Sequence, residues 1–185
     1  RVLFESPILE NMEELGLGIN FIADDGLLAV IRSQDVRMKN LKVLRLNDNR
    51  LTDVSVGELV KSPLFSGIEH LNIEYNKVGN ATAKALAESE TFMKLKILNI
   101  ERGYIDDEGI GDFLKWRGLG GLVELNLSSN KLTDAGIKQL AAAENLKSLR
   151  ILRLSCNLFG DEGALLLAES PSLSRLTHLY VGRNN

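Results

Sequence analysis

Residues 122–132 read Leu-Val-Glu-Leu-Asn-Leu-Ser-Ser-Asn-Lys-Leu, and the spacing LxxLxLxxNxL within this stretch decides the fold. The same spacing of apolar residues begins at residues 41, 68, 95, 122, 149 and 176, so successive copies start 27 residues apart. A further copy begins at Met12, 29 residues before the one at residue 41. Self-similarity at a fixed period predicts a repeat protein in which each copy is one structural unit.

Each repeat predicts one short strand followed by one helix. Alternation in LxLx places the leucines on one face of a strand and the residues between them on the other. The asparagine can bond backbone groups in the turn that follows, and stacked asparagines would form a ladder. Gly103 replaces the asparagine in one copy, so the turn before Tyr104 should be weaker or rearranged. The helices should then begin at N-cap residues, which we predict to be Asp24, Asp53, Asn80, Asp107, Asp134 and Asp161.

The spacing and its period resemble the leucine-rich-repeat family, in the helical, ribonuclease-inhibitor-like subclass also seen in intracellular immune receptors and Ran GTPase-activating proteins. The resemblance covers essentially all 185 residues. It implies an α/β fold: a right-handed curved solenoid, or horseshoe, with parallel strands on the concave face and helices on the convex face. Strands pack ~4.8 Å apart and helices ~8–10 Å apart, so the helices must occupy the outer circumference.

Residues 1–185 should form a single array, with repeats starting near 12, 41, 68, 95, 122, 149 and 176. Residues 4–9 match residues 168–173, which indicates that the chain begins inside the helix of an earlier repeat. It stops just after a strand, and neither end shows the polar capping unit of a free-standing array. We expect the chain to be an excerpt from a longer array, or a degradation product of one.

Composition argues against several functional classes. A net charge of −3 and a pI near 5.5, with 22 basic residues spread along the chain, argue against nucleic-acid binding. No apolar run reaches the ~20 residues of a membrane span. The one cysteine, Cys156, excludes internal disulfides and a Cys-rich metal site. No signal sequence is visible, so we expect a cytoplasmic or otherwise intracellular protein.

The outward strand positions supply the candidate binding site. Asn72, Asn99 and Asn126 form a row of amides on three neighbouring strands, accompanied by carboxylates, arginines and tyrosines, which is the composition of an interface centre. The alternative is a solvated sheet face on which Arg102 neutralises Glu74 and Glu101. We predict a partner-binding concave face made of Arg45, His70, Asn72, Glu74, Tyr75, Asn99, Glu101, Arg102, Tyr104, Glu124, Asn126, Arg153 and Tyr180.

Catalysis, metals and cofactors find little support in these columns. Glu74 and Glu101 should lie ~5 Å apart on neighbouring strands, but a smooth sheet offers no pocket that excludes water. His70 and His178 share a column at a separation of about 19 Å, so they cannot act together. We therefore expect no catalytic residue, cofactor, metal or small-molecule substrate. Trp116 either fills a packing gap or forms a lateral binding spot.

Three functions are consistent with this pattern. The leading one is a non-enzymatic module that binds a protein or peptide partner on its concave strand face, with no nucleic-acid or membrane partner. The second is the repeat region of a regulatory protein, either a GTPase activator or a ligase-type effector, whose activity lies elsewhere. The third is an architectural or oligomerising array.

Overall fold

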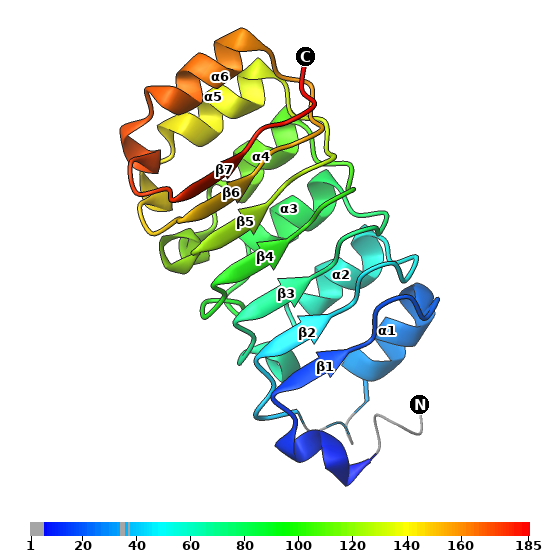
Figure 1. The fold of residues 1–185 in the computed structure, drawn as a ribbon. Coiled ribbons are helices and arrows are strands. Elements are labelled where there is room, and N and C mark those ends of the chain that lie inside the picture. Colours follow the sequence, from blue (N-terminus) through cyan, green and yellow to red (C-terminus); the bar gives the residue numbers. More distant parts are fainter. Residues whose placement is uncertain (1–5, 34–35, 37) are drawn as a thin grey trace.

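The computed structural model describes residues 6–33, 36 and 38–185. Its strands form one open, parallel sheet in the order of the chain (Figure 1). The strands are β1 (Glu14–Gly16), β2 (Val43–Arg45), β3 (His70–Asn72), β4 (Ile97–Asn99), β5 (Glu124–Asn126), β6 (Ile151–Arg153) and β7 (His178–Tyr180). The α-helices are α1 (Ala23–Ile31), α2 (Asp53–Leu59), α3 (Asn80–Ala87), α4 (Asp107–Phe113), α5 (Asp134–Ala142) and α6 (Asp161–Ala168).

Short 3-10 helices lead into several of the strands: η2 (Pro7–Asn11), η3 (Pro63–Phe65), η4 (Arg117–Gly121), η5 (Glu144–Leu146) and η6 (Pro171–Leu173). The sequence match between residues 4–9 and 168–173 therefore marks this 3-10 turn, not the interior of an α-helix as we expected. Residues 4 and 5 of that match lie outside the described residues. In the described part of the chain, no helix has the length and apolar character that crossing a bilayer requires.

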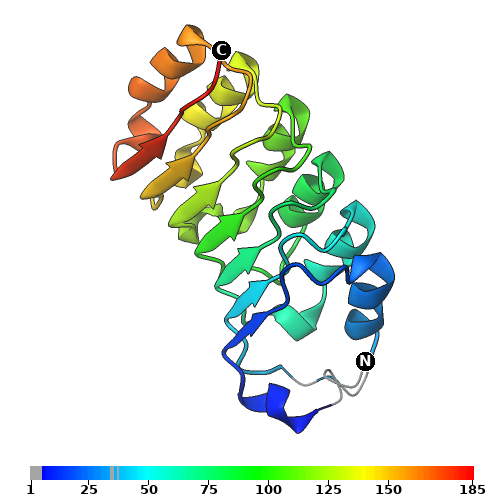
Figure 2. The ribbon, with the colours of Figure 1, turned by 45° about the vertical axis from the view of Figure 1, so that its right-hand side comes forward.

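The predicted register is confirmed. The central leucine of each strand pairs with its counterpart 27 residues on, as in Leu71 with Leu98 and Leu98 with Leu125. Between β2 and β6 these leucines are at most 2% exposed, and one continuous apolar cluster runs from Leu9 to Leu173. All the helices lie on one side of the sheet and leave its other face uncovered (Figure 2). The predicted solenoid, with strands and helices on opposite faces, is therefore present.

Buried asparagines tie each repeat to the one before it. The Asn130 amide nitrogen donates to the carbonyl oxygens of Ile100 in the preceding repeat (2.9 Å) and Leu127 in its own (3.1 Å). Its amide oxygen accepts the Ile105 N–H (3.0 Å). These groups are shielded from water, so without the amide they would be left unsatisfied. The same pattern of amide donation recurs at Asn49, Asn76, Asn157 and Asn184.

Gly103 leaves this ladder one side chain short, yet the turn keeps its path. Tyr104 N–H still donates to the Val78 carbonyl (2.7 Å), and Gly79 and Tyr104 form a parallel bridge. The expected rearrangement is absent there, because Asn130 of the next repeat holds the neighbouring Ile100 and Ile105 groups. A β-carbon on Gly103 would lie 2.9 Å from the Val78 carbonyl oxygen, which explains the space that the glycine leaves.

The residue before each ladder position adopts left-handed backbone geometry. These residues have φ between 49° and 60°, a conformation that costs a non-glycine residue ~1–2 kcal/mol. Each of the first six donates its N–H to a carbonyl of the following repeat, as Tyr75 does to Glu101 (2.9 Å). The strain is thus offset by bonds that end the strand and turn the chain toward the helix. The residues are Ile19, Asp48, Tyr75, Arg102, Ser129, Cys156 and Arg183.

The predicted helix N-caps were wrong by one position. The N-cap of α2 is Thr52 and that of α3 is Gly79, so Asp53 and Asn80 are the first helical residues. Asp53 acts on the next repeat: its carboxylate accepts the Gly79 N–H (2.8 Å) and the Thr82 N–H (3.0 Å) at the start of α3. A helix with a glycine N-cap is therefore capped by the repeat before it. Asp134 does the same for α6, through Gly160 and Gly163.

Trp116 fills a packing gap. Its side chain is fully buried, and its ring lies 6.0 Å from that of Phe113 between centroids. A β-carbon on Gly118 would come within 2.3 Å of the indole, so this glycine makes room for the ring. A residue with no exposed surface cannot form the alternative lateral binding spot. The indole N–H is the one buried side-chain polar atom without a partner among the described residues.

Replacing Asn130 with Ala should lower the free energy of unfolding by about 2–4 kcal/mol, because several buried backbone groups lose their partner at once. Urea denaturation followed by circular dichroism measures the change. Asn145→Ala is the matched control, since Asn145 is exposed and bonds only the Leu114 carbonyl. Equal losses in the two variants would contradict a special role for the ladder.

Replacing Asp134 with Ala should lower the free energy of unfolding by about 1–2 kcal/mol, the usual cost of removing a helix cap. The control is Asp161→Ala at the same helical position of α6, where the exposed carboxylate caps no described helix. Differential scanning calorimetry should show a lower midpoint for the first variant only. A similar midpoint for both would mean that capping between repeats contributes nothing.

Candidate functional site

The candidate site lies on the uncovered face of the sheet, where successive strands bring the outward residues of each repeat side by side. Register places Asn72, Asn99 and Asn126 opposite one another on β3, β4 and β5. Neighbouring parallel strands are ~4.8 Å apart, so the three amides form the continuous row that the sequence predicted. Asn72 and Asn126 are at most 9% exposed, although they face away from the core.

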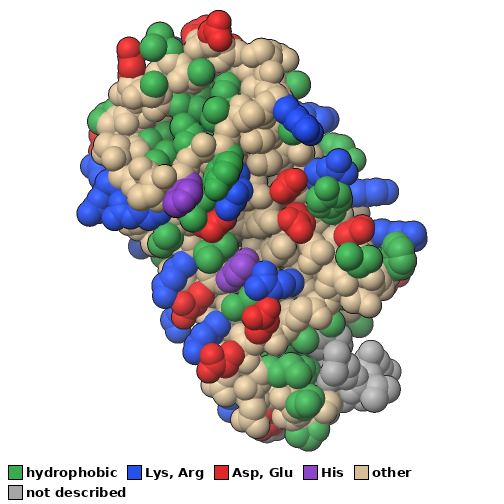
Figure 3. All heavy atoms as spheres, in the orientation of Figure 1, with side chains coloured by type: hydrophobic (Ala, Val, Ile, Leu, Met, Phe, Trp, Pro, Cys, Tyr) green, Lys and Arg blue, Asp and Glu red, His purple; other side chains and the backbone are tan. Residues whose placement is uncertain are grey.

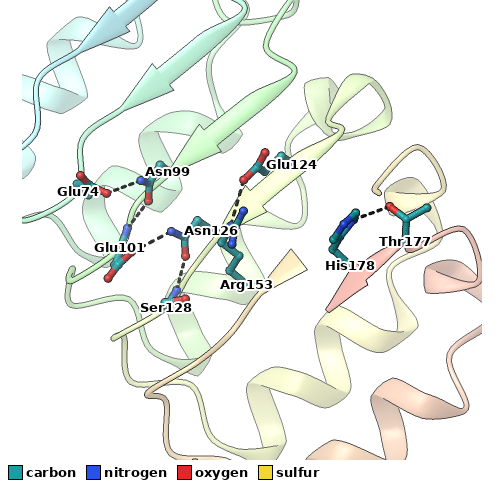
Figure 4. Close-up of polar contacts among 9 residues, drawn as sticks. All are labelled: Glu74, Asn99, Glu101, Glu124, Asn126, Ser128, Arg153, Thr177 and His178. Carbon is teal, nitrogen blue, oxygen red and sulfur yellow. Dashed lines mark hydrogen bonds and ion pairs between the residues drawn. The ribbon is translucent and has the colours of Figure 1, made fainter. Parts of the chain in front are cut away.

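Hydrogen bonds run diagonally along this row (Figure 4). Asn99 donates its amide N–H to the Glu74 carboxylate (2.5 Å), and its oxygen accepts the Glu101 N–H (3.0 Å). One repeat later, Asn126 donates to Glu101 (3.0 Å) and accepts the Ser128 N–H (3.0 Å). Each asparagine therefore holds both a carboxylate of the preceding repeat and the backbone of its own. We call this chain of bonds, from Glu74 to Ser128, the amide–carboxylate row.

The amide–carboxylate row answers how Glu74 and Glu101 are stabilised. Our alternative expectation placed Arg102 against these carboxylates, but its guanidinium lies over the Tyr75 ring, 4.4 Å from the centroid. Amides satisfy the carboxylates instead. Within the described part of the chain, neither glutamate has an ion-pair partner. Each keeps one carboxylate oxygen without a hydrogen bond from the described residues.

A hollow of about 290 Å³ lies beside the amide row. Its lining combines cationic, amide, carboxylate and apolar groups from β2 to β6, which is the mixture expected where a partner is recognised. Most of these residues belong to the predicted site; Ile97 and Leu98 do not. Ile97 could have been found as the apolar member of an outward strand column. The lining residues are Arg45, His70, Asn72, Ile97, Leu98, Asn99, Glu124, Asn126 and Arg153.

Two arginines mark the ends of the hollow, and each is fixed by a glutamate of the preceding repeat. The Arg45 Nε donates to Glu14 (2.8 Å) and the Arg153 Nε donates to Glu124 (3.1 Å). Glu124–Arg153 is the less exposed pair, with side chains 23% and 34% exposed. Partly exposed ion pairs contribute ~1 kcal/mol or less to stability, so their main effect is to orient the guanidinium groups.

His70 occupies a half-buried position in the hollow. Burial lowers the pKa of its imidazole below the usual 6.5, and the positive charge of Arg45 lowers it further, against the opposing carboxylates of Glu124 and Glu14. The neutral ring is therefore favoured at neutral pH. His178 lies on β7, outside the hollow, where its ring contacts Thr177 (3.0 Å, Figure 4).

The remaining predicted residues lie outside the hollow. Glu74 and Glu101 border it through the amide–carboxylate row. Tyr75, Arg102 and Tyr104 lie past the carboxyl ends of β3 and β4 and are exposed. On the last strand, Tyr180 stacks under Arg153, with the guanidinium 4.4 Å from the ring centroid. The structure thus divides the predicted residues between a central hollow and one edge of the sheet.

The chemistry of the hollow suits recognition. Among the described residues no group of three or more His, Cys, Asp or Glu side chains is arranged to hold a metal ion. Glu74 and Glu101 are each engaged by an amide, and Cys156 is exposed outside the hollow. Nothing in this arrangement points to a nucleophile with an activating base.

Comparison with known proteins agrees with the repeat pattern. A family model described as Leucine Rich repeat matches residues 37–60, 122–141 and 145–168. No curated protein matches the chain in sequence. Together with the seven-stranded parallel sheet, the match defines the chain as a leucine-rich-repeat solenoid.

Two solved structures show the same fold. The crystal structure of the internalin inlF from Listeria monocytogenes str. 4b F2365 superposes with a TM-score of 0.60 at 24% identity, covering 97% of this chain and 44% of that one. Listeria monocytogenes InlP superposes with a TM-score of 0.59 at 16% identity, covering 96% and 51%. The chain therefore spans about half the length of these structures.

Lowering the pH from 7.5 to 5.5 should destabilise the chain through His70. Its folded pKa lies below the unfolded value, so the unfolded state binds more protons and stability falls as the pH drops through about 6.5. His70→Gln should reduce this loss in urea denaturation, whereas His178→Gln, at the exposed strand, should not. An identical pH dependence in the wild type and His70→Gln would contradict the assignment.

Proposed function

We propose that this solenoid is a non-enzymatic interaction module that binds a protein or peptide partner along the uncovered strand face, centred on the hollow. The observation that carries the proposal is the amide row, which places polar groups of three successive strands in one line beside the hollow. Leucine-rich repeats commonly serve protein interaction. The presence of one α-helix in each of six repeats is in keeping with the helical, ribonuclease-inhibitor-like subclass, which we retain as part of the proposal.

The size of the hollow favours side chains of a partner over a small molecule. Small-molecule sites usually enclose ~300–1,000 Å³ and bury most of their ligand, whereas this hollow is at the lower limit and lies on an open sheet. A partner side chain could enter it while the rest of the partner lies across the neighbouring strands. Ile97 and Leu98 would supply apolar contact at its floor.

Hydrogen-bonding capacity remains available along the amide row. The Asn72 oxygen accepts the Glu74 N–H (3.0 Å), but its amide nitrogen donates to no described group. Asn99 and Asn126 each use one amide N–H on a carboxylate and keep the second. Unused donors held in a fixed line, with their orientation set by internal bonds, lose little entropy when a partner binds. This preorganisation is what an interface centre requires.

The Asn72→Ala/Asn99→Ala variant should weaken partner binding about tenfold or more, as expected for truncation at an interface centre. Peptides selected from a random phage-displayed library on the wild-type chain, then synthesised with a fluorescent label, serve as probes in anisotropy titrations. Lys138→Ala is the control, because Lys138 is exposed on α5 on the opposite, helical face. Circular dichroism should confirm that both variants stay folded.

Peptides that keep their affinity for the double variant but lose it with Lys138→Ala would place the binding surface on the helices. That outcome would overturn the proposal.

A further inference from the structure

A second polar surface lies at the edge of the sheet where the strands end. Five exposed side chains from three successive repeats lie there: Tyr75, Lys77, Arg102, Tyr104 and Lys131. We call them the rim cluster. None of them lines the hollow, so the rim cluster is a surface separate from the proposed binding site. Lys77 and Lys131 were not among the residues predicted from the sequence.

Backbone hydrogen bonds fix the rim cluster as two parallel rows. Tyr75 and Arg102 belong to the left-handed positions, and each donates its N–H to the repeat that follows (2.9 and 3.0 Å). Lys77, Tyr104 and Lys131 each donate to the repeat before (2.7, 2.7 and 2.9 Å). Repeats are stacked at ~4.8 Å, so the whole cluster spans about 10 Å on a rigid frame.

Cations and aromatic rings alternate within these rows. The Arg102 guanidinium lies over the Tyr75 ring (4.4 Å), and the Lys131 ammonium lies over the Tyr104 ring (5.2 Å). Tyr75 is 44% exposed and Tyr104 is 53% exposed. Stacking occupies the flat face of a guanidinium and leaves its N–H edge free to bind a carboxylate. The rings therefore hold the cations in place without consuming their donors.

The charges of the rim cluster lack partners, unlike those at the opposite edge of the sheet. Among the described residues, no carboxylate lies within ion-pair distance of Lys77, Arg102 or Lys131. At the other edge, Lys42 pairs with Glu13 (3.1 Å) and Lys96 with Glu69 (2.6 Å).

The same contrast is visible on the surface. In Figure 3, basic and hydrophobic side chains gather along the right-hand edge, while basic and acidic side chains lie together on the left.

We propose that the rim cluster is a docking site for a short acidic segment of a partner protein. Carboxylates of the segment bind the N–H edge of Arg102 and the ammonium groups of Lys77 and Lys131. An apolar or aromatic side chain between those carboxylates packs on the exposed Tyr104 ring. A span of about 10 Å accommodates roughly three residues of an extended chain, at ~3.3 Å each.

The surroundings favour an acidic peptide over a nucleic acid or a membrane surface. Glu74 and Glu101 lie next to the rim cluster in sequence and carry carboxylates without ion pairs, which would repel a continuous phosphate backbone. The chain as a whole carries a net charge of −3. Three cations within about 10 Å would neutralise few phosphates, and tight nucleic-acid binding needs many such contacts. A peptide can place its carboxylates on the cations alone.

The test uses nuclear magnetic resonance titration of the isotope-labelled chain with synthetic octapeptides that alternate aspartate with leucine or tyrosine. We expect shift changes at the amides of residues 75–77, 102–104 and 131, and binding that weakens as salt rises. Peptides with asparagine in place of aspartate should not bind. The Lys77→Gln/Arg102→Gln/Lys131→Gln variant should bind the acidic peptides at least about tenfold more weakly, from three lost charge contacts.

The matched control removes the same number of charges from the other edge. The Lys42→Gln/Lys94→Gln/Lys96→Gln variant should retain wild-type affinity for the acidic peptides. Tyr104→Ala should weaken binding about threefold, since an exposed cation–π contact contributes ~0.5–1 kcal/mol, while Tyr104→Phe should not. All substituted residues are exposed, and thermal melting should verify that each variant stays folded.

Three results would overturn the proposal. Equal loss of affinity in the two triple variants would show attraction by net charge only. Shift changes confined to the hollow, or loss of binding in Asn72→Ala/Asn99→Ala, would place the acidic peptide on the other surface. Tighter binding of a twelve-nucleotide oligothymidine or of phosphatidylserine vesicles, lost in the first triple variant, would assign the rim cluster to phosphate.

Discussion

A single buried amide in the turn of each repeat supports the whole solenoid. The asparagine at this position donates to carbonyls of two successive repeats, as Asn130 does to Ile100 and Leu127. A tight turn out of a parallel strand leaves such carbonyls without a strand partner, and burying them unpaired would cost several kcal/mol in total. The amide removes this cost and fixes the distance between repeats. Every column of side chains inherits its spacing from that bond.

The same stacking divides the surface into zones with different chemistry. On the uncovered face, asparagines and glutamates of adjacent repeats satisfy one another, as Asn99 and Glu74 do. At the edge where the strands begin, charges pair across repeats, as Lys96 and Glu69 do. At the edge where the strands end, aromatic rings hold cations that have no counter-ion among the described residues, as Tyr75 holds Arg102. The zone that lacks internal compensation has the most to gain from a partner.

The wrong predictions have a common physical origin. A carboxylate at the start of a helix was assigned to its own helix, but Asp53 caps α3, which belongs to the next repeat. Arg102 was considered as the partner of nearby glutamates, but left-handed backbone geometry turns its side chain toward Tyr75. In both cases sequence proximity was a poor guide, because repeats that touch in space are about 27 residues apart in the chain.

The sequence by itself determined the repeat, the register and the columns of outward residues, since a fixed period of leucines permits only one way of stacking identical strands. It therefore predicted the row of Asn72, Asn99 and Asn126. Only the tertiary structure decided which groups within those columns pair and which stay free. Such pairing depends on rotamers and on backbone angles at a few turn residues, and a difference of ~1 kcal/mol between alternative partners leaves no trace in the spacing of leucines.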